Sequence, residues 1–152
     1  MVRVLFLCHG NICRSPMAEF VMRELVRQAG ASGWIVAASA AVSREEIGDD
    51  IHRGARRKLT EMGIPFEKRA ARQVTRADMD SFDYVLLMEA YNKIRLSAIV
   101  GEKAEKAQML LSFAGEERDI ADPWYTGDFD KAYDDILCGC TALLKTILEK
   151  GT

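Results

Sequence analysis

The 152-residue chain carries 21 basic and 23 acidic side chains, a formal net charge of -2, and 49% hydrophobic residues. This balance is typical of a single globular domain, residues 1–152, and gives no reason to expect a nucleic-acid partner. No apolar run reaches the roughly 20 residues that a membrane helix needs, and the apolar opening is too short for a signal peptide. We therefore expect a cytoplasmic protein with no membrane partner, in which the four cysteines form no disulfide framework.

Strand and helix patterns alternate along the chain. The apolar, β-branched residues 2–7 predict a strand that is buried on both faces, and residues 8–15 predict a loop. Ser15 and Pro16 then predict the N-cap and first residue of a helix that ends near Gly30.

The remaining predicted elements continue the alternation. Thr75 and Asp78 form a capping pattern that predicts the start of a short helix. The other expected elements are strands at 34–38, 84–88 and 107–111 and helices at 51–62, at 89–100 and from 129 onward. This order predicts an α/β fold with a four-stranded parallel sheet and helices on both faces. Ligands of such sheets bind at the carboxyl ends of the strands, where Cys8 lies.

The loop after the first strand carries the strongest chemical signal. It reads Cys8-His9-Gly10-Asn11-Ile12-Cys13-Arg14-Ser15-Pro16. A loop that wraps between a buried strand and a helix turns its N–H groups inward, and the helix adds the positive end of its dipole. We expect Gly10 to allow the tight curvature and the resulting cradle to bind an anion.

The side chains of this loop suit nucleophilic chemistry on a phosphate. In a positive field Cys8 is expected to be deprotonated near neutral pH, and Ser15 can donate a hydrogen bond to its sulfur. Arg14 can bind two phosphate oxygens through its planar guanidinium group. The loop has no Gly-Lys-Ser/Thr of a nucleotide-binding loop. The only two histidines, His9 and His52, have no clustered ligands around them, so we expect neither a metal nor a cofactor.

Simpler interpretations exist for the same residues. Cys8 could be a small buried residue at the end of a strand, and Arg14 could be a solvated residue in the first turn of the helix. Arginine opposes the helix dipole at that position, however, so its presence there indicates a bound anion.

These residues resemble a known family. The run from Cys8 to Glu19 is similar to the N-terminal signature of the low-molecular-weight protein tyrosine phosphatases. The resemblance extends through residues 71–73 and 83–86 to the run Asp122-Pro123-Trp124-Tyr125-Thr126-Gly127-Asp128-Phe129. It implies a flavodoxin-like phosphatase fold and hydrolysis of phosphotyrosine and small aryl phosphates through a phosphocysteine on Cys8.

The resemblance also implies roles for residues outside the loop. Asp122 would be the general acid and then the general base, and Pro123 would hold its backbone extended. On its own, an Asp before Pro is as well explained as a turn residue. Trp124 and Tyr125 would flank the pocket and stack on the substrate ring, although either could be an ordinary surface aromatic.

The expected phosphate and substrate site has several members. It comprises His9, Gly10, Asn11, Ile12, Cys13, Ser15, Trp124 and Tyr125. The resemblance implies that Asn11 and Ser39 hold the loop in shape. It also implies that Cys13 forms a reversible disulfide with Cys8, unless Cys13 only packs. Cys138 and Cys140 are interpreted as structural.

Three residues depart from the family pattern. His9 stands where many relatives have Leu, Glu89 where Asp is common, and Arg69 where a supporting His often lies. We expect these changes to leave the reaction type intact but to alter the support of the loop, and we expect His9 to lie at the pocket rim.

The expected partners are a phosphotyrosine protein, such as a tyrosine kinase, with inorganic phosphate or vanadate as competitive ligands. One alternative is an arginine phosphatase on the same scaffold. The resemblance implies that this class has Thr at the loop position of Ile12, and the bulky Ile12 favours phosphotyrosine. A second is a thioredoxin-coupled arsenate reductase. That class needs a resolving cysteine pair, and Cys138 and Cys140 suit this role badly because they are predicted to lie on different sides of a helix. A third is a silent phosphopeptide-binding module, which would need neither Cys8 nor Asp122.

Overall fold

The computed structural model describes residues 1–151 and has a four-stranded sheet at its centre. The strands are β1 (Val2–Cys8), β2 (Ile35–Ala41), β3 (Tyr84–Leu87) and β4 (Gln108–Met109). All neighbours are parallel, in the order β2-β1-β3-β4. The predicted parallel α/β sheet is therefore confirmed.

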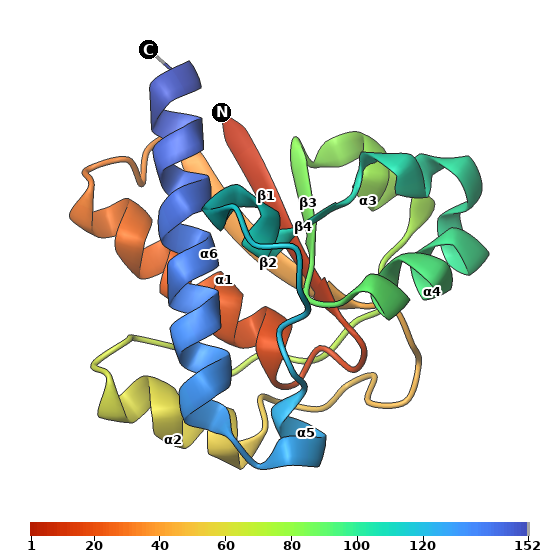
Figure 1. Ribbon diagram of the computed structural model, residues 1–152, viewed down its shortest axis with the longest axis horizontal. Helices are drawn as coiled ribbons and strands as arrows, with labels where there is room; N and C mark the ends of the chain where they lie inside the picture. Colours follow the sequence, from red (N-terminus) through yellow and green to blue (C-terminus); the bar gives the residue numbers. More distant parts are fainter. Residues whose placement is uncertain (152) are drawn as a thin grey trace.

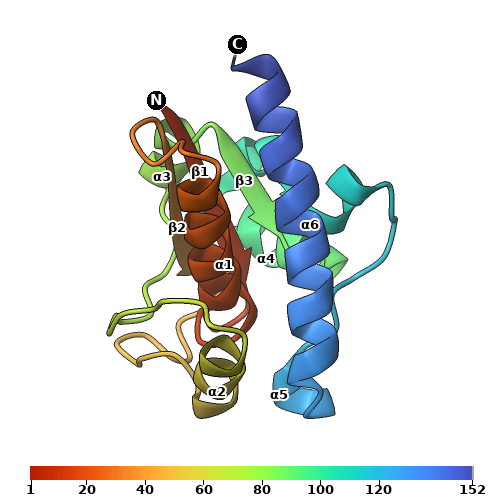
Figure 2. The ribbon, with the colours of Figure 1, turned by 90° about the vertical axis from the view of Figure 1, so that its left-hand side faces the viewer.

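Helices connect the strands and cover both faces of the sheet. They are α1 (Arg14–Gln28), α2 (Arg53–Glu61), α3 (Arg76–Ser81), α4 (Ala90–Val100), α5 (Pro123–Thr126) and α6 (Phe129–Lys150). Two 3₁₀ helices, η1 (Gly101–Lys106) and η2 (Leu110–Ala114), flank β4. Figure 1 shows α1, α2 and α6 on one side of the strands and α3 and α4 on the other. Figure 2 shows α1 and α6 side by side over the sheet. Within residues 1–151, no helix is long and apolar enough to cross a membrane.

Alternation along β1 divides the core into two layers. Val4 and Phe6 pack with α1, α2 and α6, whereas Leu5 and Leu7 pack with α3 and α4. All four side chains are fully buried. A strand that is buried on both faces has a continuous apolar sequence, which is why β1 could be predicted from the sequence.

Most predicted bounds shift by one or two residues, and three differences have a clear structural cause. β2 runs to Ala41 because it stays paired with β1 up to Cys8, although Ala and Ser are weak strand formers. β4 is confirmed only at Gln108–Met109, since Leu110 opens a 3₁₀ helix against α6. Gly139 of α6 allows this approach, because a Cβ there would lie 2.6 Å from the Leu110 Cγ.

The third difference concerns the start of α1. The helix begins at Arg14, with Cys13 at the N-cap and no side-chain cap, so the prediction of Ser15 as N-cap is wrong. The Ser15 hydroxyl is engaged elsewhere in the site, as described below. The predicted capping box of Thr75 and Asp78 at the start of α3 is confirmed.

Candidate active site

The loop that joins β1 to α1 lies at the carboxyl end of the sheet with its carbonyl groups turned outward. The carbonyl of Cys8 accepts from Val42 N at 3.0 Å, and that of Ile12 accepts from His52 N at 2.8 Å. The carbonyl of His9 accepts from the Ser43 hydroxyl at 2.8 Å. In a trans peptide the next N–H points the opposite way. The N–H groups of the following residues therefore face the inside of the loop, which is the geometry that the predicted anion cradle requires.

Asn11 holds the loop in this shape from within. It is the one non-glycine residue with a positive φ, 60°, among residues 1–151, whereas Gly10, which was expected to allow the tight curvature, has no positive φ. Its amide Nδ2 donates to Ser15 Oγ at 2.8 Å and to Ser39 Oγ at 2.9 Å. The Ser39 hydroxyl in turn donates to Glu19 at 2.6 Å. Asparagine tolerates the left-handed region, and these bonds fix its side chain.

Arg69 completes this network on the other side of Asn11. Its guanidinium group donates to Asn11 Oδ1, which also accepts from Arg72 N at 3.3 Å. Because Oδ1 only accepts, these donors fix the orientation of the amide and aim its N–H₂ group at the two serines. The departure at Arg69 therefore keeps a supporting contact to the loop.

The sulfur of Cys8 lies inside the cradle, next to Ser15. Ser15 Oγ lies 3.1 Å from Cys8 Sγ, and Ser15 N donates to the sulfur at 3.4 Å. Since Ser15 Oγ accepts from Asn11, its own proton is free to point at the sulfur. This arrangement surrounds the Cys8 sulfur with two hydrogen-bond donors and explains why Ser15 is not available as a helix cap.

The second cysteine of the loop has a different environment. Burial, together with the nearby Cys8 and Asp122, raises the pKa of Cys13 to about 12, although Arg14 opposes this. Cys13 therefore stays a neutral thiol at physiological pH, and Cys8 remains the candidate nucleophile of the loop.

Arg14 is buried at the bottom of the site and is held by three groups. Its Nη1 donates to Ile120 O at 2.8 Å and lies 3.2 Å from Glu89 Oε2, and its Nη2 donates to Asp122 Oδ2 at 3.2 Å. Burial opposes the charge, but Cys8, Asp122 and Glu89 together raise the pKa of Arg14. Its Nε is buried and has no partner among residues 1–151. A buried donor without an acceptor is costly, and a bound oxyanion would satisfy it.

Asp122 lies on the wall opposite the loop. Its backbone is extended, φ -78° and ψ 113°, as Pro123 predicts, and its Oδ1 accepts from Trp124 N at 3.0 Å to cap α5. The four-residue helix α5 was not predicted. It turns the chain so that Trp124 and Tyr125 both line the site.

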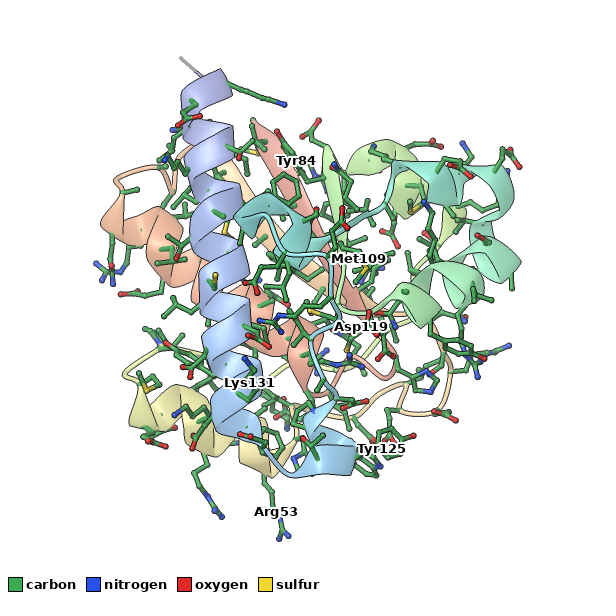
Figure 3. The ribbon with its side chains drawn as sticks, in the orientation of Figure 1. Arg53, Tyr84, Met109, Asp119, Tyr125 and Lys131 are labelled. Atoms are coloured by element: carbon green, nitrogen blue, oxygen red, sulfur yellow. The ribbon has the colours of Figure 1, made fainter. Side chains whose placement is uncertain are left out.

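These groups surround one cavity of about 390 Å³. The predicted residues that line it are Cys8, His9, Gly10, Ile12, Cys13, Arg14, Asp122, Trp124 and Tyr125. Glu45 and Glu46 also line it and were not predicted, because no motif marks the segment that follows β2. Asn11, Ser15 and Ser39 are buried behind the wall and support it. His9 lies at the rim, as expected, where its Nε2 contacts Glu45. Figure 3 shows Tyr125 and Arg53 at one end of the molecule and Tyr84, where β3 begins, at the other.

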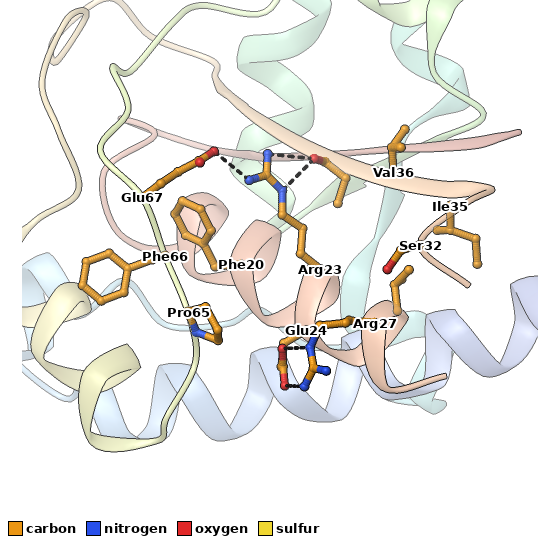
Figure 4. A pocket seen from close by; sticks show the side chains of 12 residues that line it. Phe20, Arg23, Glu24, Arg27, Ser32, Ile35, Val36, Pro65, Phe66 and Glu67 are labelled. Atoms are coloured by element: carbon orange, nitrogen blue, oxygen red, sulfur yellow. Dashed lines mark hydrogen bonds and ion pairs between the residues drawn. The ribbon is translucent and has the colours of Figure 1, made fainter. Parts of the chain in front are cut away.

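A larger cavity, about 570 Å³, lies between α1, the edge strand β2 and residues 65–67 (Figure 4). Arg23 there donates to Glu67 at 3.0 Å and Arg27 to Glu24 at 2.7 Å. Because this cavity holds no cysteine or histidine and its charges are paired, we assign the chemistry to the smaller one. Among the described residues, no group of three or more His, Cys, Asp or Glu could hold a metal ion.

Comparison with known proteins decides the family. The sequence model described as low molecular weight phosphotyrosine protein phosphatase matches residues 3–152. The chain belongs to this family. It is 41% identical to the low molecular weight protein-tyrosine-phosphatase YfkJ of Bacillus subtilis, over 99% of this chain and 98% of that protein.

Solved structures of the family agree with this assignment. The crystal structure of YfkJ from Bacillus subtilis covers 100% of this chain and 98% of its own, with a TM-score of 0.95 and 39% identity. Vibrio vulnificus Wzb in complex with benzylphosphonate covers 95% of this chain and 98% of its own, with a TM-score of 0.84 and 29% identity. The suspected family and its fold are thus confirmed.

The aromatic wall of the phosphatase cavity rests on His52, which the sequence analysis did not assign to the site. The His52 ring stacks on Phe129 at 5.5 Å and meets Trp124 edge to face at 5.5 Å. Its Nδ1 accepts from Gly54 N at 3.0 Å and so caps α2. Burial, together with the nearby Arg53, lowers the pKa of His52, which keeps Nδ1 available as an acceptor.

The two cysteines of α6 differ in environment. Cys140 is buried, which suits the structural role expected of it, whereas Cys138 is exposed on α6. They lie on different sides of the helix, as the sequence predicts.

The segment that leads to Asp122 is anchored to α6 and to the residues at the start of α4. Arg118 donates to both carboxylate oxygens of the buried Asp135, at 3.0 and 2.8 Å. Asp119 accepts from Ala90 N at 2.9 Å, and Ile120 N donates to Met88 O at 2.8 Å. These bonds fix the chain just before Asp122.

We predict that Asp135→Asn lowers the melting temperature at pH 7. Hydrogen bonds from Arg118 hold the pKa of Asp135 below its usual range, against the effect of burial. A lowered pKa in the folded state contributes stability above the unfolded value, about 3.9, and this is lost as the pH falls through the folded value. The difference from wild type should therefore shrink below about pH 4.

Thermal melts between pH 7 and pH 3 measure this, with Asp134→Asn as the control because Asp134 is exposed. An unchanged melting temperature for Asp135→Asn at pH 7 would show that the anchor is not needed.

Proposed function

We propose that the protein is a tyrosine phosphatase that hydrolyses phosphotyrosine and small aryl phosphates through a phosphocysteine intermediate. The observation that carries the proposal is the buried, unpartnered Nε of Arg14 in the same cavity as Cys8 and Asp122. The site thus combines a nucleophile, an acid and an anion-binding donor without an acceptor of its own.

In the first step the Cys8 thiolate attacks phosphorus and the bond to the tyrosine oxygen breaks. Asp122 gives its proton to the leaving phenolate oxygen, so tyrosine departs neutral and Asp122 becomes a carboxylate. Arg14 and the inward N–H groups of the loop stabilise the three equatorial oxygens. A bound phosphate would also replace Asp122 as a partner of Arg14, which frees the carboxyl group for proton transfer.

In the second step water attacks the phosphocysteine and the sulfur–phosphorus bond breaks. Asp122 accepts the water proton and inorganic phosphate is formed. The sulfur leaves as a thiolate, which the Ser15 hydroxyl, 3.1 Å away, stabilises by a hydrogen bond. The cycle returns Cys8 and Asp122 to their starting states, and inorganic phosphate or vanadate competes for the same cradle.

The cavity walls support an aryl phosphate as the substrate. Trp124 and Tyr125 offer ring faces, and they are 55% and 82% exposed, so a substrate ring can reach them. Ile12 adds an apolar contact that suits a phenyl ring better than a guanidinium group. A similar protein, Wzb from Vibrio vulnificus, was crystallised with benzylphosphonate, in which a phosphonate is joined to a phenyl ring through a methylene group.

The physiological substrate in this proposal is a phosphotyrosine protein, with a tyrosine kinase among the candidates. Free thiols at Cys8 and Cys13 require a reducing compartment, which supports the cytoplasm as the place of action.

The proposal predicts phosphate release from a phosphotyrosine peptide by wild type without added metal. Cys8→Ser should abolish turnover, because no phosphocysteine forms. Asp122→Ala should lower kcat by about 10²- to 10⁴-fold on a peptide. Steady-state kinetics with phosphotyrosine and phosphoarginine peptides measure this. Full turnover by Cys8→Ser would sink the mechanism, and faster release from phosphoarginine would favour an arginine phosphatase.

We also propose that Cys13 protects Cys8 from irreversible oxidation. Hydrogen peroxide oxidises the Cys8 thiolate to a sulfenic acid, which condenses with the Cys13 thiol to a disulfide and releases water. Wild type treated with peroxide should regain activity with dithiothreitol, whereas Cys13→Ser should not. Equal recovery by the two proteins would contradict this role, and Cys138→Ser is the control because Cys138 is exposed on α6.

A further inference from the structure

A second hollow lies beside the catalytic cavity, and the function proposed above does not use it. This groove, about 630 Å³, runs between residues 42–45, which follow β2, and the outer side of α4. Its lining includes Arg44, Glu45, Tyr91, Ile94 and Arg95. Figure 1 shows the loop after β2 passing between α4 and α5, so the groove begins at the same end of the sheet as the active site.

The groove and the catalytic cavity share a wall. Glu45 lines both hollows. Ser43 ties this wall to the catalytic loop, because its hydroxyl donates to His9 O at 2.8 Å and accepts from Glu45 N at 3.4 Å. A chain that leaves the catalytic cavity over residues 43–45 therefore enters the groove directly.

Exposed apolar side chains gather around these two hollows. Eight large hydrophobic side chains are exposed among residues 1–151. Four of them line a wall of the catalytic cavity or the groove: Trp124 and Tyr125 in the first, Tyr91 and Ile94 in the second. Ile94 is 66% exposed on α4, although polar side chains are usual at the exposed surface of a helix. Such a concentration is typical of a surface that binds another chain.

The groove also carries two arginines that have no carboxylate partner within residues 1–151. Neither Arg44 nor Arg95 forms an ion pair with a carboxylate in the described part of the chain. The Arg95 guanidinium lies 5.5 Å from the centre of the Tyr91 ring. The one acidic residue in the lining, Glu45, contacts His9 instead. The charges that remain favour an acidic side chain on the bound chain.

We propose that this groove binds the part of the substrate that flanks the phosphotyrosine, and that it selects a large apolar and an acidic side chain there. The inference rests on the proposed function, since it places the phosphotyrosine in the catalytic cavity. The cavity on the other side of Trp124, between α2 and the start of α6, fits the role less well. It shares no residue with the catalytic cavity, and its Lys58 is paired with Asp130 at 2.8 Å.

The test compares two phosphotyrosine nonapeptides and p-nitrophenyl phosphate, which has no flank. One peptide carries Leu and Glu on both sides of the phosphotyrosine, and the other carries Ser at those positions. Wild type should show the higher kcat/KM for the Leu/Glu peptide through a lower KM. The double variant Arg44→Glu/Arg95→Glu should lose about fivefold or more on that peptide. It should keep its activity on p-nitrophenyl phosphate within about twofold at 0.15 M salt, because exposed charges are screened.

Arg57→Glu is the matched control, since Arg57 is an exposed helical arginine that lines the cavity on the opposite side. It should leave the preference unchanged. Fluorescence anisotropy with labelled peptides and Cys8→Ser protein measures docking without turnover, so loss of catalysis and loss of docking are separated. The inference is overturned if wild type does not distinguish the peptides in binding, if the double variant keeps the preference, or if Arg57→Glu alone removes it.

Discussion

The site depends on one buried cation. Arg14 is 1% exposed, and a charge in that position is unfavourable unless it is paired and hydrogen-bonded. Its three partners come from two separate parts of the chain: the Ile120 carbonyl and Asp122 from the segment before α5, and Glu89, which is the N-cap of α4. The requirement to pair Arg14 therefore brings the start of α1, the start of α4 and the segment before α5 to one point. The Nε that these partners leave unsatisfied is the feature on which the proposed binding of an oxyanion rests.

The loop around this cation is held by side chains and not by regular structure. Asn11 occupies the left-handed turn, and its amide is fixed by Arg69 on one side and by two serines on the other. The same bonds leave the Ser15 proton for the Cys8 sulfur. The shape of the loop and the surroundings of the sulfur thus have a common cause, because the contacts that hold the loop also orient the Ser15 hydroxyl toward Cys8.

The sequence predicts the parts of this protein that follow from local patterns. The buried strand β1, the long helix α6 and the capping box of α3 each have a local signal, and each is found. The start of α1 was misplaced because the Ser15 hydroxyl bonds to groups seven and four residues away across the loop. The fourth strand was predicted too long because Leu110 and Leu111 are apolar for packing against α6, and burial alone does not distinguish a strand from a 3₁₀ turn.

Contacts over long sequence distances explain most of what was missed in the site. The Ile120 carbonyl, the support of Trp124 by His52 and the rim residues Glu45 and Glu46 have no motif, because they meet the loop only after the sheet has formed. The departures at Arg69 and Glu89 could be read from the sequence, but whether their longer or different side chains still reach Asn11 and Arg14 is a matter of geometry. In the structure both do.

The account is tested most directly by following the Nε–H of Arg14 by ¹⁵N NMR while inorganic phosphate or vanadate is added to the Cys8→Ser protein. We expect the Arg14 Nε–H resonance to shift as the anion saturates the site, because the buried donor gains its missing acceptor. The assignment is checked by loss of the signal in Arg14→Lys. A resonance that stays in place while the anion binds elsewhere in the cavity would contradict the central role of this cation.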